Sequence, residues 1–342
     1  MKIKEVETTI YESQYPQIFV SITTDEGVQG IGEAWWGLSA KPVESAIRDT
    51  LAPLLIGEDP DRIEYLWNKM FKYAYRYGTE GVIMCGLSGI DLALWDLKGK
   101  RLGVPVANLF GGLVRDCIKV YASLPPLRRE KILIDQIERA VNAGFAGVKL
   151  HEVNTELVAV AREAAPKGYP IMLDVNGHWT PQEAEKNAKD LEKFDLVWLE
   201  EPIWPMQDHK SMARVRGRVR LPFAAGENEY ALSAFDSLME SGAVDYVQPE
   251  TTKIGGLTMA RKISAIADLH NFLICPHGFR VGPALYANVH WAITQMNMEW
   301  LEVPLLPENY RFPPGICLPK MINGEIYLPE GYGLGLHPEF TV

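Results

Sequence analysis

Titratable side chains follow seven successive short apolar runs, and their types suit metal binding and proton transfer. Aspartate and glutamate can hold a cation, whereas histidine and lysine can carry protons. Small polar residues placed at random would not bring acids and bases to so many successive run ends. The titratable positions are Lys149, His151, Asp174, Glu200, Glu201, Glu227, Glu250, His277 and Glu302, and the polar Asn176 and Asn228 accompany them.

Three of the carboxylates recur at nearly constant spacing. Asp174, Glu200 and Glu227 are separated by 26 and 27 positions, about the length of one strand and one helix. Carboxylates that converge without a cation repel one another and raise each other's pKa. Because oxygen ligands suit hard cations, the set predicts a Mg²⁺ site, with Mn²⁺ as the alternative and zinc disfavoured.

Lys149 and His151 lie two positions apart in "GVKLHEVN". This spacing puts both side chains on one face of a strand, where they are either exposed polar residues or a pair of proton carriers. Their place among the other polar run ends favours proton carriers. His277, in "CPHG", is the strongest candidate proton carrier in the chain, since histidine titrates near neutrality.

These residues can act together only in a fold that brings the ends of distant runs close to one another. Eight strand and helix units over about 200 residues predict a (β/α)8 barrel, in which catalytic groups converge at the carboxyl ends of the strands. A doubly wound open sheet is the alternative, but no G-x-G-x-x-G follows a strand run. The eight runs are "IKVYASL", "GVKLH", "YPIMLDVN", "LVWLEEP", "LPFAAGEN", "VDYVQPE", "FLICPHG" and "MEWLEVP".

The first third of the chain has a different pattern. "KIKEVETTIYES" and "QIFVSITTDEGVQGIGEAW" alternate like antiparallel strands with a turn at "DEG". Helical spacing then extends from Val43 to Leu109, with Gly103 as a helix stop. We expect an α+β capping domain over residues 1–113, a barrel over 114–315 and a C-terminal segment, 316–342, that returns to the cap.

Composition excludes several classes of function. With 47% apolar residues and a formal net charge of −10, the chain can bury a large core and does not suit nucleic acid as a partner. Because no apolar run reaches a membrane span and the start lacks the apolar core of a signal peptide, we expect no membrane partner and a cytoplasmic location. The scattered cysteines show no zinc or disulfide pattern and are predicted to be small buried residues. They are Cys85, Cys117, Cys275 and Cys317.

Several motifs together resemble the enolase superfamily, in its mandelate racemase group. In chain order they are "SGIDLALWDLKGKRLGVPVANLFGG", "LDVNG", "WLEEP", "GEN", "VQPETTKIGG" and "PHG". The resemblance covers nearly the whole chain and implies a modified TIM barrel, (β/α)7β, under an α+β cap. It also implies Mg²⁺ on Asp174, Glu200 and Glu227, and chemistry that begins by removing a proton alpha to a carboxylate. That proton is very weakly acidic, so the resulting charge needs the cation and a further donor.

The resemblance suggests roles for the proton carriers. His277 would be oriented by Glu250, which stands where the group usually has aspartate. Lys149 and His151 match a K-x-K motif whose second lysine is a base. Here His151 replaces that lysine, and it could carry a proton or bond a substrate hydroxyl.

Other run-end residues are expected to contact the substrate or the metal ligands. Glu302 matches a protonated glutamate that faces the substrate carboxylate, and neighbouring anions would raise its pKa. Asn176 and Asn228 are further substrate-binding candidates. Glu201 should point away from Glu200 and support the ligands without binding the metal.

The cap supplies specificity loops in this superfamily. Tyr15, in "YESQYPQ", and Arg76, in "YAYRYGTE", are candidates for substrate contact. Trp35 and Trp36 could do the same or could pack the cap against the barrel. A homo-oligomer, either a dimer or an octamer, is implied by the resemblance alone.

The reaction favoured by the resemblance is Mg²⁺-dependent dehydration of an acid sugar, an aldonate or aldarate, to a 2-keto-3-deoxy acid. The substrate would be a small-molecule carboxylate. Two competent bases on opposite faces would instead permit racemisation or epimerisation, and a cycloisomerase is a third enzymatic alternative. From a different class, the chain could be a non-catalytic barrel that binds an acid together with its metal.

Overall fold

A small antiparallel sheet forms the first part of the chain in the computed structural model, which describes residues 1–12, 16–37, 39–337 and 340. Its neighbouring strands are β1 (Ile3–Tyr11), β2 (Gln17–Thr24) and β3 (Gln29–Ala34). Gly27, with φ of 80°, lies in the tight turn that joins β2 to β3. The strands and the turn agree with the alternating runs of the sequence.

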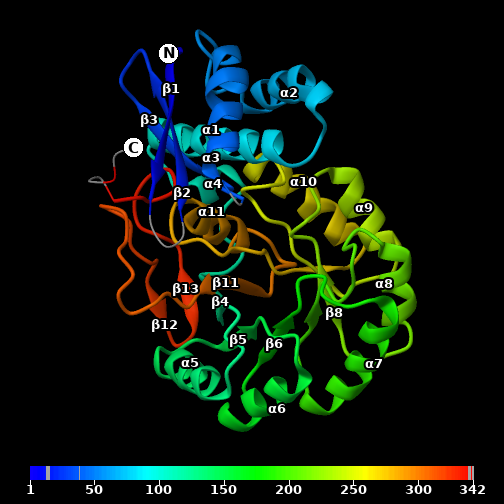
Figure 1. The fold of residues 1–342 in the computed structure, drawn as a ribbon. Helices are drawn as coiled ribbons and strands as arrows, with labels where there is room; N and C mark the ends of the chain where they lie inside the picture. Colours follow the sequence, from blue (N-terminus) through cyan, green and yellow to red (C-terminus); the bar gives the residue numbers. More distant parts are fainter. Residues whose placement is uncertain (13–15, 38, 338–339, 341–342) are drawn as a thin grey trace.

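Helices cover one side of this sheet (Figure 1). The longest, α3, packs directly on β3, where a Cβ added to Gly32 would lie 2.1 Å from the Gly89 carbonyl oxygen, so only glycine permits this approach. Gly103, with φ of 66°, ends α3 as expected. The helical elements of the cap are α1 (Ala40–Ser45), η1 (Ala46–Leu51), η2 (Ala52–Leu54), α2 (Ile63–Ala74), η3 (Tyr75–Tyr77), α3 (Val82–Leu102) and α4 (Val106–Leu109).

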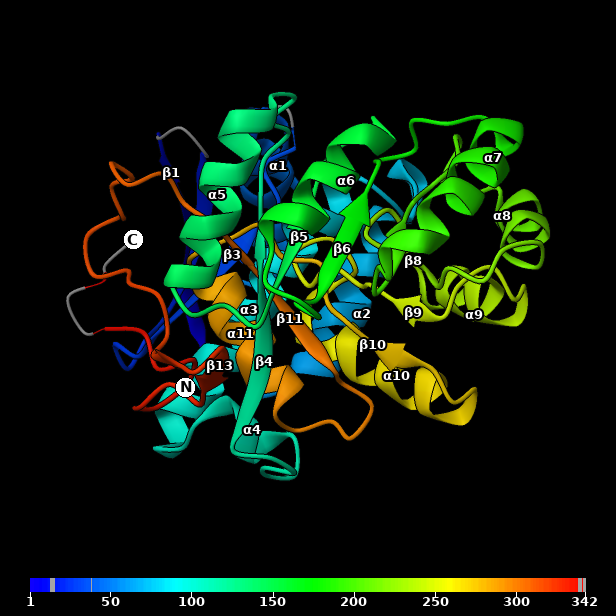
Figure 2. The ribbon, with the colours of Figure 1, turned by 90° about the horizontal axis from the view of Figure 1, so that it is seen from below.

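All eight apolar runs become parallel strands, and seven helices connect them within the described residues. This is the (β/α)7β arrangement. Figures 1 and 2 show how helices surround these strands. The sheet runs in sequence order from β4 to β10, while β11 pairs with β4. Met298, just before β11, forms an isolated bridge with Ile274 of β10. The strands are β4 (Cys117–Ser123), β5 (Gly147–Leu150), β6 (Ile171–Asp174), β7 (Leu199–Glu200), β8 (Phe223–Ala225), β9 (Tyr246–Val247), β10 (Leu273–Ile274) and β11 (Trp300–Pro304).

Helices form the outer layer of the barrel (Figure 2). Aromatic side chains fill its interior. A buried cluster centred on Tyr121, Met172, Trp198 and Trp300 comes from strands around the barrel, which is therefore a packed core and not a pore. The helices are α5 (Glu130–Asn142), α6 (Thr155–Ala164), α7 (Pro181–Leu191), α8 (His209–Arg216), α9 (Leu232–Glu240), α10 (Gly256–Leu269) and α11 (Pro283–Ala292), with the short η4 (Glu192–Phe194) after α7.

The cap docks on the loop that follows β9. The Trp67 indole donates to the Gly255 carbonyl oxygen at 2.9 Å, and buried Asp91 of α3 accepts the Thr258 N–H at 2.9 Å. A Cβ on Gly256 would lie 2.3 Å from Asp91 Oδ2, so glycine is needed there as well. These contacts hold the "TTKIGG" loop, which begins one residue after Glu250.

The C-terminal segment contacts both the barrel and the cap. Strand β13 (Glu325–Tyr327) pairs with β12 (Met321–Ile322) and, antiparallel, with β4. Further along, the Leu334 N–H donates to buried Asp96 of α3 at 2.8 Å. The segment therefore links the first barrel strand to the central cap helix.

Two expectations concern the surface. No helix in the described part of the chain is both long and apolar enough to cross a membrane. The cysteines are free. The expectation that all four are buried is wrong for two of them. Cys117, the first residue of β4, is half-buried, and Cys317 in the C-terminal segment is exposed.

Candidate active site

The carboxyl ends of the barrel strands bring the predicted residues together. Asp174 and Glu200 end the adjacent parallel strands β6 and β7, where they are register partners, and Glu227 follows β8. One carboxylate oxygen from each of the three lies within 4.8 Å of the others. The regular sequence spacing therefore corresponds to one compact group of acids.

This carboxylate triad suits a divalent cation. Asp174 and Glu200 are fully buried, and burial followed by the charge of Asp174 raises the pKa of Glu200 to about 7 despite the nearby Lys149 ammonium. Oxygen ligands that destabilise one another's charge favour a hard cation that neutralises them. The donor set fits a divalent metal at this position.

Neighbouring donors orient two of the ligands. Asn176 donates to Asp174 through its backbone N–H at 2.8 Å and its side-chain amide at 3.0 Å. The Trp198 indole donates to Glu200 Oε2 at 3.0 Å. Such contacts fix ligand carboxylates before a metal binds.

Lys149 is buried among the acids of the site. Its Nζ lies 2.9 Å from Glu200 Oε1, 3.0 Å from Glu302 Oε1 and 3.7 Å from Asp174 Oδ2. Burial opposes the positive charge, but the ion pairs with Glu200 and Glu302 outweigh it and raise the pKa of Lys149 well above its usual value. The ion pairs therefore favour a positive charge on Lys149 among the acids of the site.

The expected raised pKa of Glu302 is wrong for this structure. Burial alone would raise it, but the charges of Lys149 and His277 outweigh burial and lower the pKa of Glu302 to about 2. Glu302 Oε2 also accepts the Gly278 N–H at 3.0 Å. Lys149, which pairs with Glu200 as well as Glu302, outweighs the neighbouring anions from which a raised pKa was expected.

His277 bridges two carboxylates. Its Nδ1 lies 2.7 Å from Glu250 Oε2, the predicted partner, and its Nε2 lies 2.9 Å from Glu227 Oε2. Glu250 is itself held by the Thr252 hydroxyl at 2.7 Å and the Thr252 N–H at 3.0 Å. Burial disfavours the imidazolium, but Glu227, Glu302 and Glu250 together raise the pKa of His277 well above its usual value.

His151 occupies the other end of the triad. Its Nε2 lies 3.2 Å from Asp174 Oδ2, and its Nδ1 contacts the Leu124 carbonyl oxygen. Burial lowers the pKa of His151, but the hydrogen bond to Asp174 raises it by more, so that the pKa lies above its usual value. The two imidazoles therefore contact different outer members of the triad, Asp174 and Glu227.

The two asparagines contact metal-site carboxylates. Asn176 holds Asp174, as described above. The Asn228 amide nitrogen donates to Glu201 at 3.0 and 3.1 Å, and its oxygen accepts from Lys253 Nζ at 3.0 Å. Both side chains therefore have protein partners at the site, and their contact with substrate stays a prediction.

Glu201 lies outside the triad. It is 1% exposed and held by Asn228, and burial followed by the charges of Glu227 and Asp174 raises its pKa well above the usual value. Among the cap candidates, Arg76 is exposed in η3, and Tyr15 lies outside the described residues.

Sequence reasoning missed two buried cations at the barrel mouth. Lys253 and Arg280 are each 3% exposed, and each lies beside the ring of Trp35, whose centre is 4.9 Å from Lys253 Nζ and 4.2 Å from Arg280 Cζ. Each follows a recognised motif residue by three positions, Glu250 and His277 respectively. This spacing was the one sequence feature that could have singled out the two cations. Their burial could not be predicted from it, because it depends on how the cap docks on the barrel loops.

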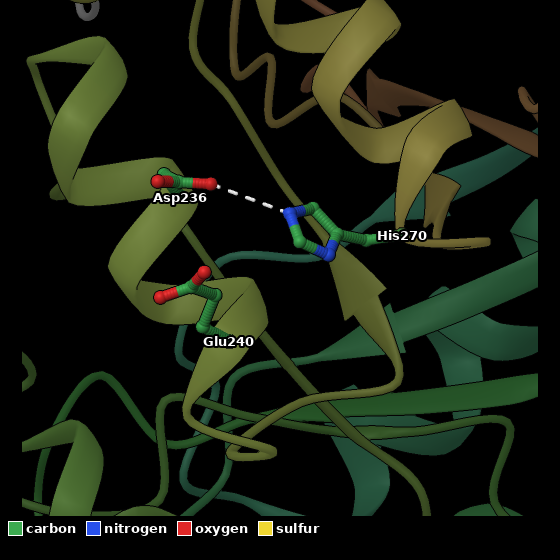
Figure 3. Close-up of side chains that lie close together, drawn as sticks. All are labelled: Asp236, Glu240 and His270. Carbon is green, nitrogen blue, oxygen red and sulfur yellow. Dashed lines mark hydrogen bonds and ion pairs between the residues drawn. The ribbon is translucent and has the colours of Figure 1, made fainter.

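A second group of possible ligands lies elsewhere on the barrel. Asp236 and Glu240 are one turn apart on α9, and the His270 ring after α10 lies beside them, with Nε2 3.3 Å from Asp236 Oδ1 (Figure 3). Glu240 is exposed and the other two are half-buried. Because His270 precedes β10 and Glu240 ends α9, this group lies toward the amino ends of the strands, away from the triad.

Comparisons with known proteins agree with the site and fold. Residues 5–111 match the mandelate racemase / muconate lactonizing enzyme N-terminal domain, and residues 133–341 match the enolase C-terminal domain-like family. A D-galactonate dehydratase of Verminephrobacter eiseniae is 33% identical, with 93% of this chain and 90% of the relative aligned. An arabinonate dehydratase of Saccharolobus solfataricus is 32% identical over 94% of this chain and 89% of its own.

A solved structure is similar over almost the full length. The 3,6-anhydro-D-galactonate cycloisomerase of Zobellia galactanivorans superposes with a TM-score of 0.92 at 30% identity, and the match covers 98% of this chain and 96% of the other.

Proposed function

This chain belongs to the mandelate racemase / muconate lactonizing enzyme family, and on that premise we propose that it is a Mg²⁺-dependent acid-sugar dehydratase. It removes the proton alpha to the carboxylate of an aldonate or aldarate and eliminates the β-hydroxyl. The enol product tautomerises to a 2-keto-3-deoxy acid. The two dehydratases that align over most of this chain support this assignment.

One observation carries the proposal: two imidazoles lie at opposite ends of the carboxylate triad. His277 contacts Glu227, and His151 contacts Asp174. Dehydration needs one group to accept the α-proton and another to deliver a proton to the leaving hydroxyl. Two separate proton carriers beside one cation site meet this need.

Asp174, Glu200 and Glu227 would hold the cation, which we propose is Mg²⁺, with Mn²⁺ as a substitute. When bound, the cation supplies positive charge beside the substrate carboxylate, where negative charge increases as the α-proton leaves. Lys149 adds a fixed positive charge to the same region. Glu302, held by Lys149 and the Gly278 N–H, lines the place for the substrate carboxylate.

His277 and His151 divide the proton transfers. Glu250 holds Nδ1 of His277, so Nε2 is the atom that takes the α-proton or protonates the leaving hydroxyl. His151, beside Lys149, performs the complementary transfer. The electron pair of the broken C–H bond forms the new C=C bond, and the hydroxyl departs as water.

An acid-sugar screen with Mg²⁺ tests the proposal. We expect at least one aldonate or aldarate to yield a 2-keto acid, detected by semicarbazide and by loss of one water in mass spectra. His277→Asn should reduce turnover by about 100-fold or more, the scale of a lost general acid or base. The proposal fails if a broad panel gives no keto acid.

A cycloisomerase is the second candidate, because the similar structure from Zobellia galactanivorans has that activity. It would convert an anhydro sugar acid without change of mass, whereas dehydration removes water. A racemase or epimerase would instead exchange the α-proton for deuterium with inversion and form no keto acid. A cytoplasmic location and a homo-oligomeric assembly complete the proposal.

A further inference from the structure

A nearly buried guanidinium lies beside the proposed catalytic groups with unused donors. Arg280 is 3% exposed, and its Nη1 donates to the Phe279 carbonyl oxygen at 3.3 Å. Within the described part of the chain, neither Nε nor Nη2 has a hydrogen-bond acceptor. Buried donors without acceptors are unfavourable, so a ligand that accepts from both would bind favourably there.

The two unused nitrogens form one edge of the guanidinium. Nε–H and Nη2–H point in parallel directions, a geometry that matches the two oxygens of a carboxylate. Glu33 lies near this edge but does not satisfy it, since its Oε1 is 3.9 Å from Nε. The Glu33 oxygens already accept from Gln17 at 2.9 Å and from the Ala284 N–H at 3.1 Å.

Arg280 lies at the junction of cap and barrel mouth. It lines a small cavity together with Gln17, Phe279, Val281, Pro304, Leu306 and Tyr310. Its guanidinium also stacks on Trp35, and the Trp35 ring centre is 6.0 Å from that of His277. One aromatic ring therefore contacts both the proposed proton carrier and the guanidinium with two unused donors.

Lys253 adds a second positive charge at the same ring. Its Nζ is 4.9 Å from the Trp35 ring centre and donates to Asn228 Oδ1. Two nearly buried cations on one indole attract an anion, and the carboxylate of Glu33, 3.9 Å from Arg280 Nε, opposes this attraction.

We propose that Arg280 binds a second carboxylate at the far end of the substrate, so that the preferred substrates are aldarates. This inference rests on the proposed function, in which the first carboxylate lies at the cation site. A six-carbon diacid spans roughly 6 Å between its terminal carbons, from C–C bonds of about 1.5 Å. Arg280 shares the Trp35 ring with His277, and the far end of such a substrate would extend toward it from the cation site.

Paired substrates test the inference. We would measure kcat/KM with Mg²⁺ for hexarates and for the hexonates of the same stereochemistry, using wild type, Arg280→Met and Arg280→Lys. Arg280→Met should lower kcat/KM for the diacid about 30- to 100-fold and for the monoacid less than about 3-fold, as loss of charge-assisted hydrogen bonds predicts. Arg280→Lys, which keeps the charge but loses the two-donor edge, should be intermediate.

A matched control separates this role from general cation–aromatic packing. Arg261 is exposed on α10, and its guanidinium lies 5.6 Å from the Trp95 ring centre, outside the site. Arg261→Met should leave the diacid-to-monoacid ratio unchanged. That ratio is taken within one variant, so it does not depend on the fraction of folded protein.

Direct binding keeps the inference separate from the proposed function. Adipate and hexanoate, which have no hydroxyl to lose, would be titrated calorimetrically into the Mg²⁺-loaded wild type and Arg280→Met. Tighter binding of adipate that disappears in the variant supports the diacid site even if the substrate screen yields no keto acid. Equal affinities for the two acids in wild type, or equal losses for both acids in Arg280→Met, would overturn it.

Discussion

The two nitrogens of His151 have different partners. Nδ1 contacts the Leu124 carbonyl oxygen, which can only accept, so Nδ1 must carry a proton. This fixes Nε2, 3.2 Å from Asp174, as the atom that can exchange a proton with a substrate. The histidine can thus take the position of the second lysine of a K-x-K motif, with the backbone selecting its tautomer.

His151→Asn is therefore expected to lower kcat by about 100-fold or more, with little change in KM, since loss of a proton carrier affects the transition state. Steady-state kinetics on the substrate found by the screen would measure both constants. His178→Asn, at an exposed histidine in the loop after β6, is the control and should leave kcat unchanged. A raised KM with normal kcat would instead assign His151 to binding a substrate hydroxyl.

At the scale of elements, strand ends were predictable and loop contacts were not. Asp174, Glu200 and Glu227 follow apolar runs at a regular spacing, so local pattern is enough to bring them together. Arg280 follows no such rule, because its burial depends on Gln17 and Trp35 of the cap, which are distant in sequence.

The charge state of Glu302 also could not be predicted from the sequence. The pKa of Glu302 depends on an Nζ–Oε1 distance of 3.0 Å to Lys149, which is set by how β5 and β11 lie on either side of β4. Asn228 likewise follows a strand as predicted, but its partners Glu201 and Lys253 come from other loops.

The contact between α11 and α4 depends on a neutral histidine. His290 of α11 is 1% exposed, and its Nδ1 accepts the Ala107 N–H at 3.1 Å. Burial lowers the pKa of His290 to about 4. Because the folded pKa lies below the unfolded value, this contribution to stability is complete above the unfolded pKa of about 6.5 and is lost as pH falls toward 4.

Acidification from pH 7 to pH 5 should consequently lower the free energy of unfolding by about 2 kcal/mol through His290 alone. Urea unfolding at both pH values would measure the loss in wild type and in His290→Asn, which cannot be protonated. The variant should lose about 2 kcal/mol less than wild type, whereas His178→Asn should behave like wild type. An equal loss in wild type and His290→Asn would show that another group controls the acid sensitivity.

At the scale of the whole molecule, negative charge is concentrated inside the barrel mouth. Asp174, Glu200, Glu201, Glu250 and Glu302 are all at most 1% exposed, and the wholly buried lysine among them is Lys149. Burial and the charge of Asp174 raise the pKa of Glu200 to about 7, so the ionised form of this carboxylate is destabilised. A cation that binds the folded chain and not the unfolded chain must stabilise the fold.

Magnesium should therefore raise the melting temperature, and chelation should lower it. At a Mg²⁺ concentration about 100 times Kd, the stabilisation is about 2.7 kcal/mol, enough for a shift of several degrees. Scanning calorimetry with Mg²⁺ or EDTA would measure the shift without any substrate. Asp174→Asn should abolish it, because the variant loses one ligand charge, whereas Asp236→Asn, at the other carboxylate and histidine group, should keep it (Figure 3). A shift that survives in Asp174→Asn and vanishes in Asp236→Asn would move the cation to the far end of the barrel and remove the basis for metal-assisted chemistry at the strand ends.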